Sequence, residues 1–88
     1  MIYTVVLAPS AQRDLQRTNP RIVPAIIEFI YGDLAKSPHR VGKPLRQELL
    51  GTLSARRGPY RILYSIDDER ITVEVIRIDH RSTAYRLR

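Results

Sequence analysis

The sequence has no cysteine and no tryptophan, and only two of its 88 residues are histidine. The lack of cysteine excludes disulfides, a catalytic thiol and Cys-based zinc sites, and two histidines are too few for a His-rich metal site. No apolar run approaches the roughly 18 residues that a membrane span needs. The first residues have no basic region of the kind that opens a signal peptide. We therefore predict a cytoplasmic protein that uses no cofactor and no metal.

Acidic residues are scarce as well: 15 Lys and Arg stand against 9 Asp and Glu, a formal net charge of +6. Residues 1–38 carry four basic and three acidic residues, net +1, whereas residues 39–88 carry eleven and six, net +5. Thirteen of the basic residues are arginine, whose planar fork binds phosphate through two parallel hydrogen bonds. The second half is thus where a polyanion is expected to bind, although a solvated basic face would give the same composition.

The length predicts a single domain over residues 1–88, and the apolar pattern predicts its elements. A β-branched and aromatic run over residues 2–7 is typical of a strand. Ser10 is the expected N-cap of a short helix through Arg17. Isoleucines at helical spacing predict a second helix from Pro20 to residues 34–36, in which Pro24 would remove one backbone hydrogen bond if it lay beyond the first turn.

The second half predicts three further strands after a polar loop over residues 37–44. Their ranges are 53–56, 60–66 and 71–78, separated by Gly58-Pro59 and by an acidic turn. The predicted fold class is α+β: two N-terminal helices pack on one face of a mainly antiparallel four-stranded sheet, in the order β-α-α-β-β-β.

The turn lengths also predict which side chains share a face of the sheet. If Ile66 pairs with Ile71, and Arg56 with Pro59, alternation along the strands separates an apolar face from a second face that contains Arg61. The predicted helix-facing residues are Leu53, Ala55, Ile62, Tyr64, Ile66, Ile71, Val73 and Val75. The opposite face receives Ser54, Arg56, Arg61, Leu63 and Ile76. Arg61 then lies in mid-sheet opposite Ile76, where it would bind phosphate or pair with Glu74.

The residues after the last strand include the best catalytic side chains of the chain: His80, Arg81 and Tyr85. As the exit of a central strand, this segment is expected to lie along the edge of the face that contains Arg61. Cationic neighbours lower the pKa of a tyrosine or a histidine. Each residue alone is more often a surface or packing residue, but together they indicate a site that cleaves a phosphodiester.

Several stretches together resemble the RelE/ParE toxin superfamily, on the RelE side. The most specific runs from Gly58 to Tyr64 and has the pattern G-x-Y-R-(I/L/V)-x-Y, followed downstream by His80-Arg81 and Tyr85-Arg86. Residues 11–15 in the first helix and Lys43-Pro44-Leu45 before the strands also match. The resemblance covers essentially the whole chain.

The resemblance implies the toxin of a type II toxin–antitoxin pair, which enters the ribosomal A site and cuts messenger RNA there without a metal. The 2′-hydroxyl of the RNA attacks the adjacent phosphorus and leaves a 2′,3′-cyclic phosphate. Arg61 and Arg81 match the arginines that bind the phosphate and stabilise the transition state. Tyr85 matches a C-terminal tyrosine that orients the base or takes the proton, and His80 is a rival for that proton.

Other positions are implied to bind RNA or the ribosome, although Thr52 and Ser54 stand where some RelE toxins have lysines. These positions are Lys43, Arg46, Ser54, Arg56, Arg57, Arg77 and Arg86. The implied partners are a RelB-like antitoxin in a heterotetramer or larger complex, the ribosome, and operator DNA reached only through the antitoxin, with no membrane. A ParE-like inhibitor of DNA gyrase and a non-catalytic RNA-binding module are the alternatives.

Overall fold

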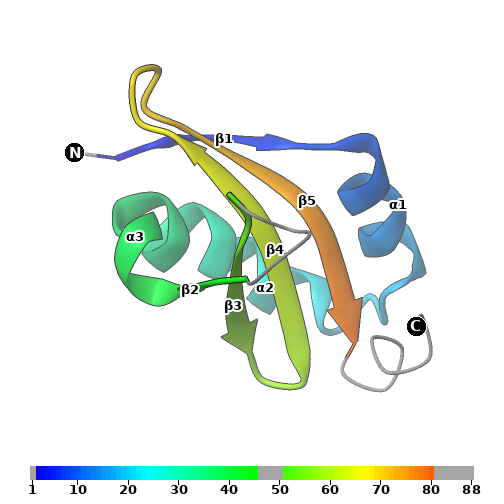
Figure 1. The fold of residues 1–88 in the computed structure, drawn as a ribbon. Coiled ribbons are helices and arrows are strands. Elements are labelled where there is room, and N and C mark those ends of the chain that lie inside the picture. Colours follow the sequence, from blue (N-terminus) through cyan, green and yellow to red (C-terminus); the bar gives the residue numbers. More distant parts are fainter. Residues whose placement is uncertain (1, 46–50, 81–88) are drawn as a thin grey trace.

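The computed structural model describes residues 2–45 and 51–80. The elements are β1 (Thr4–Leu7), α1 (Pro9–Arg17), α2 (Val23–Phe29), the π-helical segment η1 (Ile30–Leu34), α3 (Pro38–Val41), β2 (Lys43–Pro44), β3 (Leu53–Arg57), β4 (Tyr60–Asp67) and β5 (Thr72–His80). In the view of Figure 1, α2 passes behind a twisted sheet, with α1 beside β5 at the right and α3 at the left. In the described parts of the chain, no helix is long and apolar enough to cross a bilayer.

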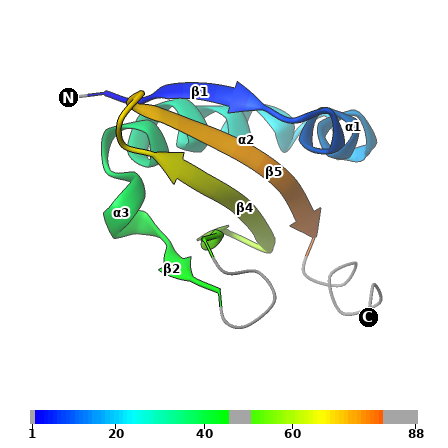
Figure 2. The same cartoon turned by 45° about the horizontal axis from the view of Figure 1, so that its top comes forward.

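The sheet has the strand order β1-β5-β4-β3-β2. Strand β1 is parallel to β5, and the other neighbours are antiparallel. Figure 2 shows α2 running along one side of this sheet. The predicted α+β class, element order and mainly antiparallel pairing are confirmed. The predicted number of four strands is wrong by one, because the loop expected over residues 37–44 contains the short helix α3 and the two-residue strand β2.

The two N-terminal helices begin at other residues than the cap signals predict. Ala8, not Ser10, precedes the first turn of α1, and Ser10 instead donates its hydroxyl proton to the carbonyl oxygen of Ile76. The second helix begins at Val23. This start places Pro24 in the first turn, where the missing N–H has no partner to lose.

The core lies between the helices and the inner face of the sheet. Its fully buried residues come from α1, α2, η1 and the three long strands: Ala11, Ile26, Ile30, Leu34, Ala55, Ile62, Tyr64, Val73, Val75 and Ile78. Tyr64 donates its hydroxyl proton to the carbonyl oxygen of Pro38 at 2.6 Å, which attaches α3 to the sheet. Burial raises the pKa of Tyr64 to about 12, so the phenol stays a hydrogen-bond donor at neutral pH.

The β3–β4 hairpin pairs Arg57 with Tyr60, not Arg56 with Pro59 as predicted. Proline has no N–H to contribute to the ladder, so it is better placed in the turn. Gly58, the other turn residue, has a φ of +61° that glycine adopts without strain. Each residue of β4 therefore lies opposite the β3 residue that is two positions later in the chain than predicted.

The β4–β5 hairpin is shifted in the same way, because Asp67 pairs with Thr72. The Asp67 carboxylate accepts a hydrogen bond from the N–H of Arg70 and so stabilises the turn. Ile71 lies in this turn with a φ of +50°, and its predicted place on the core face is wrong. A shift of two positions keeps the side chains of β4 on their predicted faces, so Arg61 still points away from the helices.

A β-bulge in β5 breaks this alternation. Leu63 pairs with Arg77 while the next residue of β4, Tyr64, pairs with Val75, so Ile76 is the extra residue. Beyond the bulge, the face of each β5 side chain is reversed relative to an unbroken strand. Ile78 therefore joins the core, and Asp79, not Ile76, lies opposite Arg61. The prediction that Arg61 lies opposite Ile76 is therefore wrong.

The polar groups of α1 hold the bulge in place. The ladder between β1 and β5 ends at Val75, and the backbone N–H of Ala8 donates to the carbonyl oxygen of that residue at 2.9 Å. Ser10 then binds the Ile76 carbonyl. The carboxylate of Asp14 accepts the N–H of Ile78 at 2.8 Å. The backbone beyond the end of β1 is thus satisfied by side chains of a helix.

We predict that Asp14→Ala lowers the free energy of unfolding by about 2–4 kcal/mol. Asp14 is nearly buried and also binds the guanidinium of Arg77, so its removal leaves the Ile78 N–H without an acceptor and takes two hydrogen bonds from a partly buried cation. Urea unfolding followed by circular dichroism measures the change. Arg13→Ala, an exposed position of the same helix, is the control, and equal stabilities of the two variants would contradict the assignment.

Candidate functional site

The outer face of the sheet, which is the face turned away from α2, bears five of the seven predicted site residues that lie within the described part of the chain. Two cross-strand rows define it. In one row, Arg56 of β3 pairs with Arg61 of β4, and Arg61 pairs with Asp79 of β5. In the next, Ser54 and Arg77 flank Leu63, and Lys43 of β2 pairs with Ser54. Five of the predicted site residues are thus brought together on this face: Lys43, Ser54, Arg56, Arg61 and Arg77.

Arg61 is at the centre of this face and has an unsatisfied donor. Its Nε is buried and has no hydrogen-bond partner among the residues that the structure describes. A buried donor without an acceptor costs on the order of 1–3 kcal/mol, and native proteins rarely keep one. Sites that keep such a group are often those at which a ligand supplies the missing partner.

Asp79 is the acid opposite Arg61, where sequence reasoning considered Glu74. Glu74 instead pairs with Ser65, four residues along β4 from Arg61. The side chain of Asp79 is only 8% exposed, and its Oδ1 lies 3.5 Å from Nη2 of Arg77. Burial raises the pKa of Asp79, while the charges of Arg77 and Arg61 oppose that rise and Asp14 adds to it.

Arg77 links this acid to α1. Its Nε donates to Oδ2 of Asp14 at 2.9 Å and its Nη2 donates to Oδ1 at 3.3 Å. The hydrogen bond to Asp14 raises the pKa of Arg77 further, so the guanidinium is charged throughout the range of protein stability. Sequence reasoning assigned Arg77 to RNA binding, whereas in the structure two of its donors already have protein acceptors.

His80 does not share a face with Arg61. It pairs with Tyr60, and the two rings meet edge to face with their centres 5.1 Å apart. Tyr60 packs against the core, which places this pair on the helix side of the sheet. The bulge at Ile76 causes the separation. The predicted residues Arg46, Arg81, Tyr85 and Arg86 lie outside the described residues.

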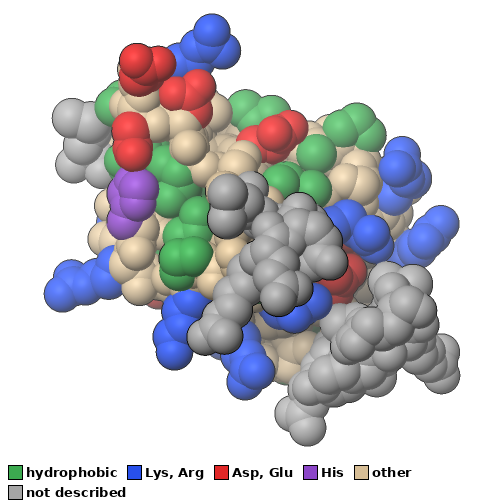
Figure 3. Space-filling view, in the orientation of Figure 1, with side chains coloured by type: hydrophobic (Ala, Val, Ile, Leu, Met, Phe, Trp, Pro, Cys, Tyr) green, Lys and Arg blue, Asp and Glu red, His purple; other side chains and the backbone are tan. Residues whose placement is uncertain are grey.

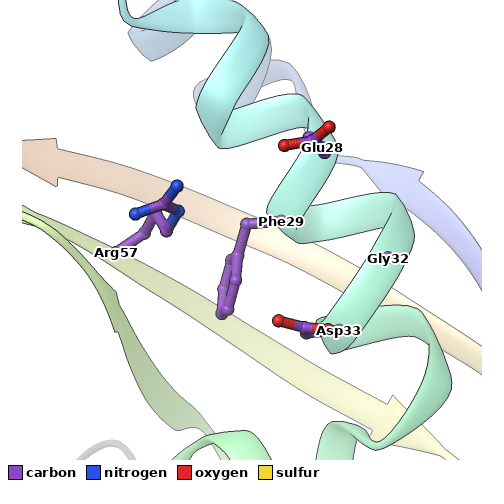
Figure 4. A pocket seen from close by; sticks show the side chains of 5 residues that line it. All are labelled: Glu28, Phe29, Gly32, Asp33 and Arg57. Carbon is purple, nitrogen blue, oxygen red and sulfur yellow. The ribbon is translucent and has the colours of Figure 1, made fainter.

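Arg57 also faces the helices. It lines a hollow of about 420 Å³ together with Glu28, Phe29, Gly32 and Asp33 of α2 and η1, and Figure 4 shows its guanidinium across the Phe29 ring from the Asp33 carboxylate. Arg57 is the immediate neighbour of Arg56, but alternation along β3 sends the two to opposite faces. Its predicted role in RNA binding therefore applies to a different surface from that of Arg61.

Comparison with known proteins decides the family. The family described as ParE toxin of type II toxin–antitoxin system, parDE, matches residues 5–85. The chain is 58% identical to toxin RelG of Mycobacterium tuberculosis, over 98% of this chain and 99% of that protein. It is 51% identical to toxin RelE of the same organism, over 97% of this chain and 88% of the relative. The protein belongs to this toxin family, and its relatives are of the RelE type.

A solved structure agrees with the family assignment. The toxin–antitoxin complex RelBE2 from Mycobacterium tuberculosis contains a chain that superposes on the toxin with a TM-score of 0.90 and 57% identity. The superposition covers 93% of the toxin and 94% of that chain. The RelE-like fold expected from the resemblance is thereby confirmed.

Charge on the toxin is divided along the strands. In Figure 3, which views the outer face, acidic side chains gather at the top near the β4–β5 turn, with a basic side chain beside them, and the other Lys and Arg side chains lie at the right and in the lower half. The acidic residues of that turn are Asp67, Asp68 and Glu69. Asp68 accepts hydrogen bonds from Tyr3 and contacts His39, and its pKa is lowered by both. This end ties three segments together and would repel RNA, so the opposite end, with Arg56 and Arg61, is the candidate polyanion site.

The sequence contains no clear signal for the role of Asp79. An unbroken strand would place it on the helix side, and only the extra residue at Ile76 moves it beside Arg61. Asp14 lies in the helix segment that resembles the family. Its contact with the bulge depends on how α1 packs against β5, which the sequence pattern does not show.

We predict that the difference in melting temperature between the toxin and its Asp79→Asn variant depends on pH. Because burial raises the pKa of Asp79, the folded state binds the proton more tightly than the unfolded chain does. Wild-type stability contributed by this group therefore falls as the pH rises from the ordinary carboxyl pKa through the raised one. Asparagine does not titrate, so the variant gains stability relative to wild type as the pH rises above the ordinary carboxyl pKa of about 4, and the gain levels off once the pH exceeds the raised pKa of Asp79.

Thermal unfolding at several pH values measures this difference. Asp33→Asn, the same chemical change on η1, is the matched control. A difference that stays constant, or that moves in the opposite direction, would show that burial does not dominate at Asp79.

Proposed function

We propose that this toxin is a ribosome-dependent endoribonuclease that cuts messenger RNA in the A site and so inhibits translation in the cytoplasm. The observation that carries the proposal is the buried, unsatisfied Nε of Arg61 at the centre of a basic sheet face. A phosphate oxygen is an acceptor of the right charge for it. The similarity to RelE-type toxins over nearly the full chain supports the same activity.

The proposed reaction uses the RNA's own nucleophile. The 2′-oxygen attacks the adjacent phosphorus, the bond from phosphorus to the 5′-oxygen breaks, and a 2′,3′-cyclic phosphate forms. The 2′-hydroxyl loses its proton to a base, and the leaving 5′-oxygen takes up a proton. Arg61, together with Arg81, offsets the charge that develops on the non-bridging oxygens.

The proton acceptor is proposed to be Tyr85. Histidine is the most common general base in enzymes, but β5 directs His80 to the helix side, away from Arg61. Its role as base would require the end of β5 to rearrange. Tyr85 matches the C-terminal tyrosine that the resemblance to RelE toxins implies for this role. Cleavage without a metal stays part of the proposal, and cutting that persists in excess chelator would support it.

We expect Arg61→Ala to lower the rate of A-site cleavage by about 10²–10³-fold, the usual cost of removing one donor to a developing oxyanion. The measurement is primer extension on a defined message in a purified translation system. Arg21→Ala removes the same charge from an exposed turn before α2 and should leave cleavage within a few-fold of wild type.

Other outcomes of the same assay decide between the alternatives. Equal loss in both variants would mean that general charge, not Arg61, matters. If the wild-type toxin makes no cuts and inhibits supercoiling by DNA gyrase, the proposal is wrong and the ParE-like alternative is supported. Binding to the ribosome without cuts, weakening steeply with salt, would favour a non-catalytic module.

We further infer that a RelB-like antitoxin neutralises the toxin in a heteromeric complex, with a heterotetramer as the expected stoichiometry. The support is the 0.90 TM-score to a chain of a toxin–antitoxin complex. An acidic or amphipathic antitoxin segment would complement the basic outer face. In this proposal, operator DNA is contacted through the antitoxin.

Expression of the toxin alone should arrest growth, and co-expression with the neighbouring antitoxin gene should restore it. Light scattering after size-exclusion chromatography of the co-purified pair gives the stoichiometry. Arg56→Glu, on the outer face, should weaken the complex more than Arg21→Glu does. Growth arrest that persists with the antitoxin present would contradict the inferred pairing.

A further inference from the structure

The arrangement of the outer face raises the question of what holds Arg61 in place. Arg61 and Asp79 are directly opposed in the ladder between β4 and β5, so their side chains leave the same face with Cβ atoms about 5 Å apart. The charge of Arg61 lowers the pKa of Asp79, which places the two groups in electrostatic reach of each other. We propose that Asp79 is a positioning residue that orients the Arg61 guanidinium toward the scissile phosphate.

Asp79 is suited to orient Arg61 without occupying its donors. Within the described residues, the ion pair of Asp79 is with Arg77 at 3.5 Å, and none joins it to Arg61. An Arg61 bound in two hydrogen bonds to a carboxylate would have to give them up before binding RNA. An acid that attracts the guanidinium while its own close contact goes to another arginine leaves the donors of Arg61 available.

The acid itself is held from the side of α1. Arg77, which contacts Asp79, is bound through two hydrogen bonds to Asp14, and Asp14 also binds the backbone of Ile78. These contacts fix the position of the two β5 residues that directly precede Asp79. Asp79 is therefore a charge at a defined position, as a residue that orients a catalytic group must be.

A purely structural role fits this acid poorly. Its side chain is 8% exposed, and burial of a carboxylate opposes folding, as the raised pKa shows. Arg77 already has Asp14 as a partner and does not need Asp79 for neutralisation. An acid retained at a cost to stability beside an unsatisfied arginine is the pattern of a functional site.

A double-mutant cycle tests the proposal, and its cleavage readout rests on the proposed ribonuclease function. Asp79→Asn should lower the single-turnover cleavage rate by on the order of 10–100-fold, the effect of a misplaced catalytic group, with little change in the toxin concentration that gives half the maximal rate. In the Arg61→Ala background the same substitution should have almost no effect, because its target is gone. Asp33→Asn on η1 is the matched control.

A spectroscopic readout separates failure of this inference from failure of the proposed function. The Nε–H signal of Arg61 in a ¹H–¹⁵N spectrum is identified by its loss in Arg61→Lys. Asp79→Asn should shift this signal and speed its exchange with water, whether or not the toxin cleaves RNA. An unchanged signal would overturn the proposal, as would equal losses of cleavage from Asp79→Asn in the wild-type and Arg61→Ala backgrounds. If the wild-type toxin makes no cuts but Asp79→Asn still shifts the Arg61 signal, the positioning role of Asp79 is supported and the proposed ribonuclease function is rejected.

Discussion

The bulge at Ile76 is the constraint on which the arrangement of charged groups depends. One extra residue in β5 reverses the facing of the side chains that follow it, so Asp79 lies beside Arg61 and His80 lies beside Tyr60. A bulge leaves backbone groups outside the regular ladder. Here α1 supplies their partners, with Ser10 at the Ile76 carbonyl and Asp14 at the Ile78 N–H. The first helix thus controls the end of the last strand.

This control links stability to the candidate site. Asp14 satisfies the β5 backbone and the Arg77 guanidinium with one carboxylate, and Arg77 in turn contacts Asp79. A single chain of polar contacts therefore runs from the surface of α1 to the acid that faces Arg61. Such a chain is strong only when each group is satisfied. The buried Nε of Arg61, next to the last acid of this chain of contacts, has no hydrogen-bond partner among the described residues.

The two sides of the sheet have different electrostatic characters. The outer face combines Lys43, Arg56 and Arg61, and the acidic turn lies at the far end of β4 and β5. On the helix side, Arg57 shares its hollow with Glu28 and Asp33. The net charge of +6 is therefore not spread over a uniform basic surface, and the proposed phosphate-binding site lies on one face, near Arg61.

The sequence by itself determined the fold class, the face of Arg61 and the family resemblance. Strand alternation has a period of two, so hairpin errors of two positions at Pro59 and Asp67 left the face of Arg61 unchanged. Tertiary structure decided the rest. The fifth strand and the bulge at Ile76 depend on which backbone groups find partners in other elements of the chain. The sequence predicts that His80 lies near Arg61. The extra residue at Ile76, held by the packing of α1 against β5, reverses the faces of the residues that follow, so Asp79 lies beside Arg61 instead.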